Sequence, residues 1–228
     1  MTALRRFLLL ILCFSILCIP VQGAESEKLV ALTFDDGPSG RFTRTLLEGL
    51  EARNTKATFF LCGYRMEQDP DLTTRIFQEG HEIGLHGYSH NCMLNMCQCD
   101  IAQELERAMS LLPDGCQVAF LRSPGGLCNK YVRSAAEALD LSVLSWSVDP
   151  KDWATHNASA IKKEVITHVR DGDIILLHDM SDSSVEAALA IIDTLRDEGY
   201  RFVTVSELAR SKGITPAPGK EYRRFGKS

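Results

Sequence analysis

The stretch Thr33-Phe34-Asp35-Asp36-Gly37-Pro38-Ser39 places two adjacent carboxylates between an apolar run and a turn. The apolar run, residues 29–34, is typical of a buried strand, and the Gly-Pro pair ends it. Neighbouring carboxylates repel each other, so both stay ionised at a strand end only if a cation or a basic group lies beside them. A metal ion is the simplest such partner. A solvated Asp-Asp-Gly turn is the alternative, and the rest of the chain decides between the two.

Apolar segments of strand length alternate with amphipathic segments of helix length. The expected strands are residues 29–34, 57–62, 82–85, 118–121, 141–147, 173–177 and 201–205. The expected helices are residues 42–52, 100–112, 130–139, 159–169 and 183–198. Repeated strand–helix alternation indicates a parallel sheet. For a chain of this length we expect a single-domain, distorted (β/α) barrel with about seven parallel strands, rather than an open doubly wound sheet.

The first 23 residues have the features of a secretory signal peptide. Arg5 and Arg6 precede an apolar run at residues 7–20, and small residues follow it. We favour a signal peptide over a membrane-spanning helix because the run is too short to span a bilayer comfortably and no stop-transfer pattern follows. An uncleaved membrane anchor is the alternative. We therefore expect one domain over residues 24–228, secreted or associated with the cell envelope, monomeric and without a stable membrane span.

The charge of the chain argues against nucleic acid as the main ligand. The formal net charge is −5, and loss of Arg5 and Arg6 with the signal peptide takes it to −7. An acidic surface repels the phosphate backbone.

Six cysteines remain after residue 23, namely Cys62, Cys92, Cys97, Cys99, Cys116 and Cys128. An even number in an exported protein suggests disulfides, although six cysteines allow 15 connectivities. Three of them crowd residues 92–99. We expect at least one disulfide there, with a second metal site or free thiols as alternatives.

Residues suited to catalysis follow the ends of the expected strands. They are Asp35 and Asp36, His86 and His90, Arg122, Asp149 and Asp152, and His178. Active sites of (β/α) barrels lie at the carboxyl ends of the strands. The pattern therefore predicts one site at that end of the barrel.

The segment His86-Gly87-Tyr88-Ser89-His90 places two imidazoles four residues apart, within reach of one ion on a helical turn. With Asp36 as a third ligand, the set leaves an open position for water on a Zn²⁺-like ion. We expect a divalent metal, Zn²⁺ first, with Co²⁺, Ni²⁺ or Mn²⁺ as alternatives. The remaining histidines, expected at the surface or in packing, are His81, His156 and His168.

Five ordered motifs resemble those of the polysaccharide deacetylases, the carbohydrate esterase family that shares the NodB homology domain. They are Thr33-Phe34-Asp35-Asp36-Gly37-Pro38, residues 86–90, Arg122-Ser123-Pro124-Gly125-Gly126, Asp149-Pro150-Lys151-Asp152-Trp153 and Leu176-Leu177-His178. Together they cover essentially the whole chain after the signal peptide. This order of motifs makes chance agreement very improbable.

The resemblance implies a role for each matching residue. The implied metal ligands are Asp36, His86 and His90. The implied catalytic residues are the base Asp35, its orienting partner Arg122, the acid His178 and its partner Asp152. The implied substrate-binding residues are Trp153, Leu176, Gly125 and Tyr88. Leu176 and His178 also lie on the same face of their strand by period-two alternation.

Two residues depart from the family's pattern. Gly125 stands where an aromatic residue is usual, which removes a side-chain wall but keeps a backbone N–H that can donate to an oxyanion. Gly87 stands where Ser or Thr is usual, which removes a hydroxyl that could form a hydrogen bond within the segment that carries His86 and His90. Both departures leave the reacting groups in place, so they bear on the substrate more than on the activity.

The resemblance implies a hydrolase that acts on the linear amides of N-acetylated amino-sugar polymers, such as peptidoglycan or chitin-type oligosaccharides, and releases acetate. Alternatives are an esterase that acts on O-acetylated glycans and a catalytically silent carbohydrate-binding homologue. Asp35 with Arg122 and Asp152 with His178 could also be buried ion pairs that only hold the strand ends together. We expect Trp146, inside a strand, to be a core residue, and Trp153 to face a sugar.

Overall fold

The computed structural model describes residues 27–226, and the predicted signal peptide at residues 1–23 lies outside them. The strands are β1 (Lys28–Asp35), β2 (Thr58–Leu61), β3 (Glu82–Leu85), β4 (Phe120–Leu121), β5 (Ser142–Leu144), β6 (Ile174–His178), β7 (Tyr200–Phe202) and β8 (Glu221–Tyr222). The α-helices are α1 (Arg41–Ala52), α2 (Gly63–Gln68), α3 (Pro70–Gln78), α4 (Gln98–Met109), α5 (Lys130–Ala138), α6 (Ala158–His168), α7 (Asp182–Asp197) and α8 (Val205–Ser211). Two short 3₁₀ turns, η1 (Met93–Asn95) and η2 (Pro124–Gly126), precede α4 and α5. Within the described range, every helix is too short or too polar to cross a membrane.

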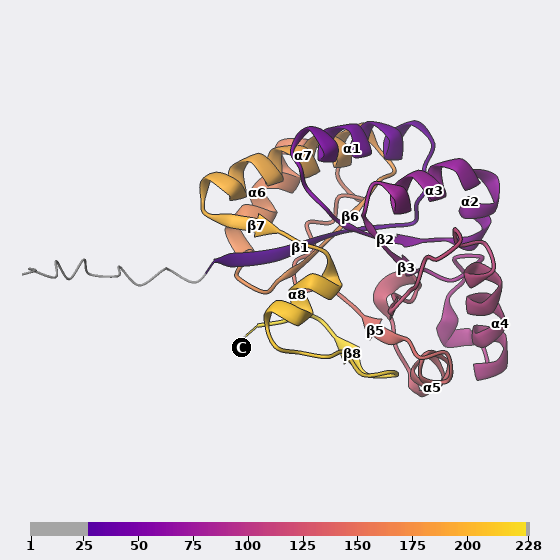
Figure 1. Ribbon diagram of the computed structural model, residues 1–228. Coiled ribbons are helices and arrows are strands. Elements are labelled where there is room, and N and C mark those ends of the chain that lie inside the picture. The colour runs from indigo at the N-terminus through magenta and orange to yellow at the C-terminus, as the bar shows by residue number, and fades with distance from the viewer. Residues whose placement is uncertain (1–26, 227–228) are drawn as a thin grey trace, which may run out of the picture.

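The strands form a curled parallel sheet with helices around it (Figure 1). Their order is β6-β1-β2-β3-β4-β5-β8, and β7 pairs with the first residues of β1. Beyond β5, Val148 pairs with Ile175 of β6, which joins the two sides of the sheet. The expected distorted (β/α) barrel is confirmed. In the register of β1 with β6, Asp35 lies beside His178, so two predicted catalytic residues meet at the carboxyl end.

The two faces of β1 explain why the site lies where it does. Side chains alternate across a strand, so one face of β1 carries Val30, Leu32 and Phe34, which belong to the main core between sheet and helices. The other face carries Leu29 and Ala31, which pack inside the barrel with α8. Thr33 and Asp35 continue that inner face toward the carboxyl end. The barrel is therefore apolar at the amino ends of its strands and polar at the carboxyl ends.

Some elements differ from those that the sequence predicts. The helices α2, α3 and α8 and the strand β8 were not expected. Three of them, α2, α8 and β8, are too short to show a clear hydrophobic period. Helix α3 is as long as α5 and buries Leu72 and Ile76 on one face, so its periodic pattern could have predicted it. The last expected strand ran to Val205, which instead begins α8. A capping box there pairs the Thr204 side chain with the backbone N–H of Glu207, and the Glu207 side chain with the backbone N–H of Thr204.

The cysteine-rich segment before α4 contains a disulfide between Cys97 and Cys99, which confirms the expected cross-link. Among the described cysteines, the others are free thiols, namely Cys62, Cys92, Cys116 and Cys128. Burial raises the pKa of Cys62 above its ordinary range, so its thiol is a packing group rather than a nucleophile.

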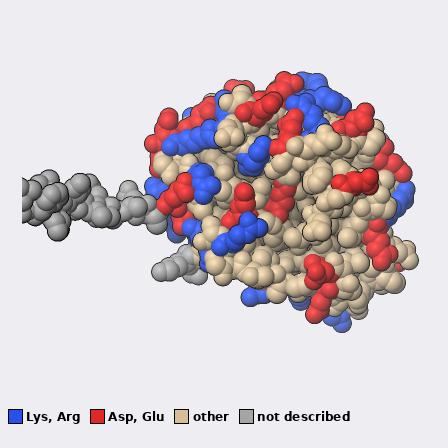
Figure 2. All heavy atoms as spheres, viewed as in Figure 1, with Lys and Arg blue, Asp and Glu red and all other residues tan. Residues whose placement is uncertain are grey.

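Charged side chains of both signs are interspersed over the face of the molecule shown in Figure 2. Some form exposed ion pairs, such as Arg53 with Asp193 and Arg201 with Glu27. Exposed pairs of this kind contribute little to stability, because water screens them. The charged groups that bear on function are the buried ones at the end of the barrel.

Candidate metal centre and active site

A cavity of about 360 Å³ lies at the carboxyl ends of the strands. Its lining residues are Asp35, Asp36, His86, His90, Gly125, Trp146, Asp149, Trp153, Leu176 and His178. Nine of these are residues that the sequence singles out for the site, and they come from all five motifs. Residues distant in sequence thus meet in one place, as the barrel hypothesis requires.

The three predicted metal ligands converge on one point. Oδ1 of Asp36 lies 3.2 Å from Nε2 of His86 and 3.0 Å from Nε2 of His90. The backbone φ angles of Asp36 and His90 are 73° and 63°, in a region that non-glycine residues rarely adopt. Such conformations cost free energy and persist where the surroundings fix them, often at functional sites.

The protonation of His86 suits a metal ligand. Its Nδ1 lies 2.7 Å from the backbone carbonyl oxygen of Arg122, so Nδ1 carries the proton and donates it. Nε2 is then the ring nitrogen that can offer its lone pair to an ion in the cavity. A histidine that binds metal through one ring nitrogen usually donates the other N–H in this way.

The donor set fits a divalent cation. Oδ1 of Asp36 is buried and has no well-aligned hydrogen-bond donor. Burial by itself would raise the pKa of Asp36, but the neighbouring His86 and His90 outweigh burial and lower that pKa below its ordinary value. The carboxylate is therefore ionised. Its oxygen and the two imidazole nitrogens lie within 4.8 Å of one another, and this ligand chemistry suits zinc and related ions.

The predicted base, Asp35, is held by a fully buried arginine. Nη1 of Arg122 donates to Oδ1 of Asp35 at 2.6 Å and to Oγ1 of Thr33 at 2.8 Å. Nη2 of Arg122 donates to the Ser145 carbonyl at 3.0 Å, and the guanidinium stacks 4.1 Å from the ring of Phe60. Arg122 is thus immobilised behind the cavity. Oδ2 of Asp35 points toward the metal site, 3.9 Å from Nε2 of His86.

The predicted acid, His178, is paired with a buried carboxylate. Its Nδ1 lies 2.8 Å from Oδ1 of Asp152, and its backbone N–H donates to Oδ2 of Asp152 at 2.8 Å. Burial alone would lower the pKa of His178, but the hydrogen bond and charge of Asp152, together with Asp35 and Asp36, raise it to about 9. His178 is therefore an imidazolium at neutral pH.

The walls of the cavity combine expected and unexpected residues. Trp153 is 65% exposed at the rim and Leu176 is buried, as suits a sugar-facing ring and an acyl pocket. Trp146, which we expected in the core, packs against the inner core cluster and also lines the cavity. The preceding strand, β5, ends at Leu144, so period-two alternation no longer sets the direction of the Trp146 side chain. Gly126 leaves the space that its indole fills, since a Cβ there would lie 2.4 Å from the ring.

Tyr88 lies outside the cavity, contrary to its expected place among the substrate-binding residues. Its hydroxyl accepts a hydrogen bond from Nη2 of Arg107 at 2.6 Å and donates to Glu67. Its ring covers Gly63, where a Cβ would lie 2.4 Å from a ring carbon. The side chain therefore connects the loop that carries His86 and His90 to α2 and α4, on the side away from the cavity.

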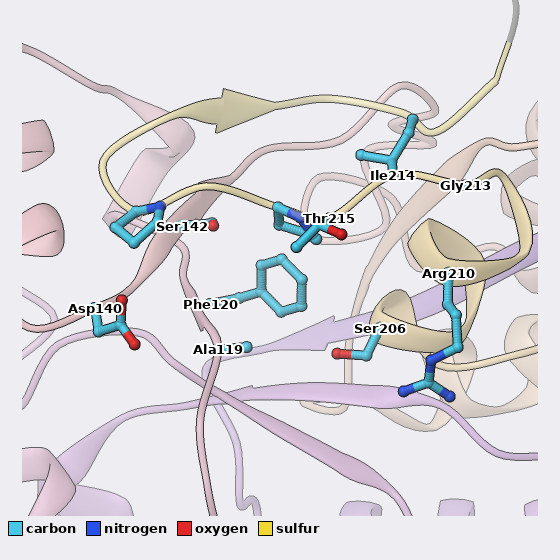
Figure 3. A pocket seen from close by; sticks show the side chains of 11 residues that line it. Ala119, Phe120, Asp140, Ser142, Ser206, Arg210, Gly213, Ile214 and Thr215 are labelled. Carbon is cyan, nitrogen blue, oxygen red and sulfur yellow. The ribbon is translucent and has the colours of Figure 1, made fainter.

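A larger cavity, of about 530 Å³, lies near the amino ends of β4 and β5 (Figure 3). The side chain of Phe120 lies in the middle of the lining residues, and that of Arg210 lies at one side (Figure 3). The hydroxyls of Ser142 and Ser206 are already used, by the Ala217 carbonyl and by Glu82. The ligand set and the acid–base pairs all lie at the other end of the barrel, so the smaller cavity is the candidate active site.

The chain is similar to known proteins in sequence and in fold. The family model described as polysaccharide deacetylase matches residues 22–144. A peptidoglycan-N-acetylglucosamine deacetylase of Bacillus cereus is 39% identical over 194 residues, which cover 82% of this chain and 91% of the relative. Peptidoglycan-N-acetylglucosamine deacetylase PgdA of Listeria monocytogenes is 35% identical over 84% of this chain, but the match spans only 41% of PgdA.

A solved structure shares the fold. The family 4 acetyl xylan esterase from Clostridium thermocellum, in complex with a cobalt ion, matches with a TM-score of 0.81 and 34% identity. The match covers 88% of this chain and 100% of that one.

Proposed function

Because the chain belongs to the polysaccharide deacetylase family, we propose that it is a metal-dependent hydrolase that removes N-acetyl groups from amino-sugar polymers and releases acetate. The observation that carries this proposal is the meeting of Asp36, His86 and His90 with an anchored carboxylate and an imidazolium in one cavity. The names of the Bacillus and Listeria relatives favour peptidoglycan as the polymer, ahead of chitin-type oligosaccharides. We further propose that the protein works outside the cytoplasmic membrane, as residues 1–23 predict.

Asp36, His86 and His90 would hold the ion, which we propose to be Zn²⁺. When bound, such an ion would polarise the acetamide carbonyl and would lower the pKa of water to about 7. Asp35 takes the proton of the attacking water on Oδ2, because Oδ1 is occupied by Arg122. Arg122 also keeps the carboxylate in its orientation throughout the reaction.

Charge that develops on the carbonyl oxygen needs hydrogen-bond donors. We assign this role to backbone N–H groups of the loop around Gly125, which lines the cavity and has open space beside its Cα. One such donor is typically worth about 10²–10³ in rate. The missing side chain at Gly125 widens the cavity where the family usually has an aromatic ring.

His178 donates a proton to the departing amine of the sugar. A general acid must be protonated when the substrate binds, and the contacts with Asp152 provide for this. Leu176 forms the apolar wall against which the acetyl methyl packs. Trp153 offers an exposed ring at the rim for a neighbouring sugar.

The pH profile of turnover tests the role of His178. Since the pKa of His178 is raised to about 9, the protonated acid persists through neutral pH, and kcat should fall as the pH rises through about 9. Asp152→Asn removes the charge that raises this pKa, so the falling limb should move to lower pH. Asp193→Asn removes an exposed carboxylate on α7 and should leave the limb in place. An unshifted limb in Asp152→Asn would show that another group is the acid.

Acetate release tests the activity itself. Purified protein loaded with Zn²⁺ should release acetate from N-acetylglucosamine oligomers and from peptidoglycan fragments, and a chelator should abolish this release. The esterase alternative is favoured by the cobalt-bound acetyl xylan esterase, so O-acetylated oligomers are assayed beside the N-acetylated ones. Faster release from the O-acetyl oligomers would favour the esterase. No release from either by the metal-loaded protein would indicate a silent homologue.

A further inference from the structure

One carboxylate oxygen on α4 binds the backbone between the two histidine ligands. Oε2 of Glu104 accepts the N–H of Tyr88 at 3.0 Å, the N–H of Ser89 at 2.8 Å and the hydroxyl of Ser89 at 2.8 Å. Hydrogen bonds to an ionised acceptor are about twice as strong as neutral ones. All three donors lie in the short segment that links His86 to His90.

The opposite side of this segment is held by the start of α2. The N–H of Gly63 donates to the Gly87 carbonyl at 2.9 Å, and the N–H of Tyr64 donates to the Tyr88 carbonyl at 3.0 Å. The loop of residues 86–90 is thus hydrogen-bonded to two helices. Amides of α2 bind its carbonyls, and Glu104 of α4 binds its amides. His90 follows the residues that make these hydrogen bonds, and its side chain is partly exposed.

The loop needs such outside support because its backbone is not relaxed. Gly87 and His90 have φ angles of 79° and 63°, and the second value is unfavourable for a residue with a side chain. Contacts outside the loop must therefore outweigh this cost.

The glycine at residue 87 leaves room for the side chain of Met93, and Glu104 lies at ordinary contact distance beside it. A Cβ at that position would lie 3.0 Å from Cε of Met93 and 3.6 Å from Oε2 of Glu104. The hydroxyl that the family usually carries at this position is absent, and a carboxylate from the next helix binds the loop.

We propose that Glu104 is a positioning residue for the metal centre: by binding the amides of Tyr88 and Ser89, it sets where His90 lies relative to Asp36 and His86. The inference rests on the proposed metal site. It predicts that Glu104 governs metal affinity and ligand geometry without touching the ion or the substrate. A merely structural role would instead change folding stability alone.

Metal binding measured directly tests this inference. Metal-free protein is titrated with Co²⁺ and, by competition with a chromophoric chelator, with Zn²⁺. Glu104→Ala should weaken binding about 10–100-fold, the usual effect of losing a partner that orients a ligand. Its Co²⁺ absorption spectrum should also change, because the ligand geometry changes. Glu104→Gln keeps an oxygen that accepts the same three donors, so it should restore most of the affinity and the spectrum.

A matched control lies on the same helix. Glu106 is exposed two residues further along α4, and Glu106→Ala should bind metal as the wild type does. Thermal unfolding of the metal-free variants separates affinity from stability. If Glu104→Ala does not fold, Ser89→Ala removes one of the three donors and should still weaken binding several-fold.

The outcomes distinguish the inference from the function on which it rests. Equal affinity and spectrum in wild type and Glu104→Ala would overturn the inference and leave the proposed hydrolase untouched. A glutamine variant as weak as the alanine variant would contradict the role of the acceptor oxygen. A wild type that binds neither ion would overturn the metal site, and with it both proposals.

Discussion

Asp35→Asn is expected to lower kcat by roughly 10²–10⁴, the usual contribution of a general base, while the bound metal stays close to the wild-type level. Asparagine has the shape of aspartate and can still accept a hydrogen bond from Arg122, but it cannot take a proton at neutral pH. Metal content by elemental analysis and turnover by acetate release are measured on the same preparation. Equal loss of metal and turnover would show that Asp35 is a ligand rather than the base.

This variant also leaves the buried Arg122 without its counter-charge. Removing one partner of a buried ion pair typically costs about 3–5 kcal/mol of stability. Thermal unfolding should therefore shift downward in Asp35→Asn, and turnover is measured well below the new midpoint. Conversion of Asp193, an exposed ion-pair partner on α7, to asparagine is the control and should change neither the midpoint nor kcat appreciably.

His90→Ala is expected to deplete the protein of metal and to abolish turnover with it. One of three ligands is lost, so the affinity should fall by more than the roughly 100-fold that loss of an orienting partner costs. The side chain of His90 is 43% exposed, so its removal opens no cavity in the core and the fold should persist. Metal titration checks the affinity and circular dichroism checks the fold.

The control for this variant is His168→Ala, on the exposed face of α6, which removes an imidazole far from the cavity lining. It should bind metal and turn over as the wild type does. Full metal occupancy in His90→Ala would remove this residue from the ligand set.

The strand ends predict the site well, for a physical reason. Parallel strands bring their carboxyl ends to one edge, so Asp35, His86 and His178 must meet if the strands are placed correctly. The pairs Asp35–Arg122 and Asp152–His178 then follow from complementary charge. An error of a few residues in a predicted strand boundary does not change this outcome, because the site residues lie at or just beyond the end of each strand.

Side chains on loops could not be placed in the same way. Tyr88 turns toward α2 because Gly63 lacks a side chain, and α2 itself is too short for a periodic pattern. Trp146 follows a strand that ends earlier than its apolar run suggests. Glu104 belongs to a helix that the sequence does predict. Its link to the loop of residues 86–90 depends on how α4 packs, which no local pattern encodes.

We propose that one ion binds between Asp36, His86 and His90, and the other roles in the cavity depend on it. Anomalous diffraction from crystals grown with Zn²⁺, recorded on both sides of the zinc absorption edge, tests it most directly. We expect one strong peak between Oδ1 of Asp36 and Nε2 of the two histidines, within the cavity that Asp35 and His178 also line. A strong peak elsewhere in the crystal, with none at this position, would contradict this expectation.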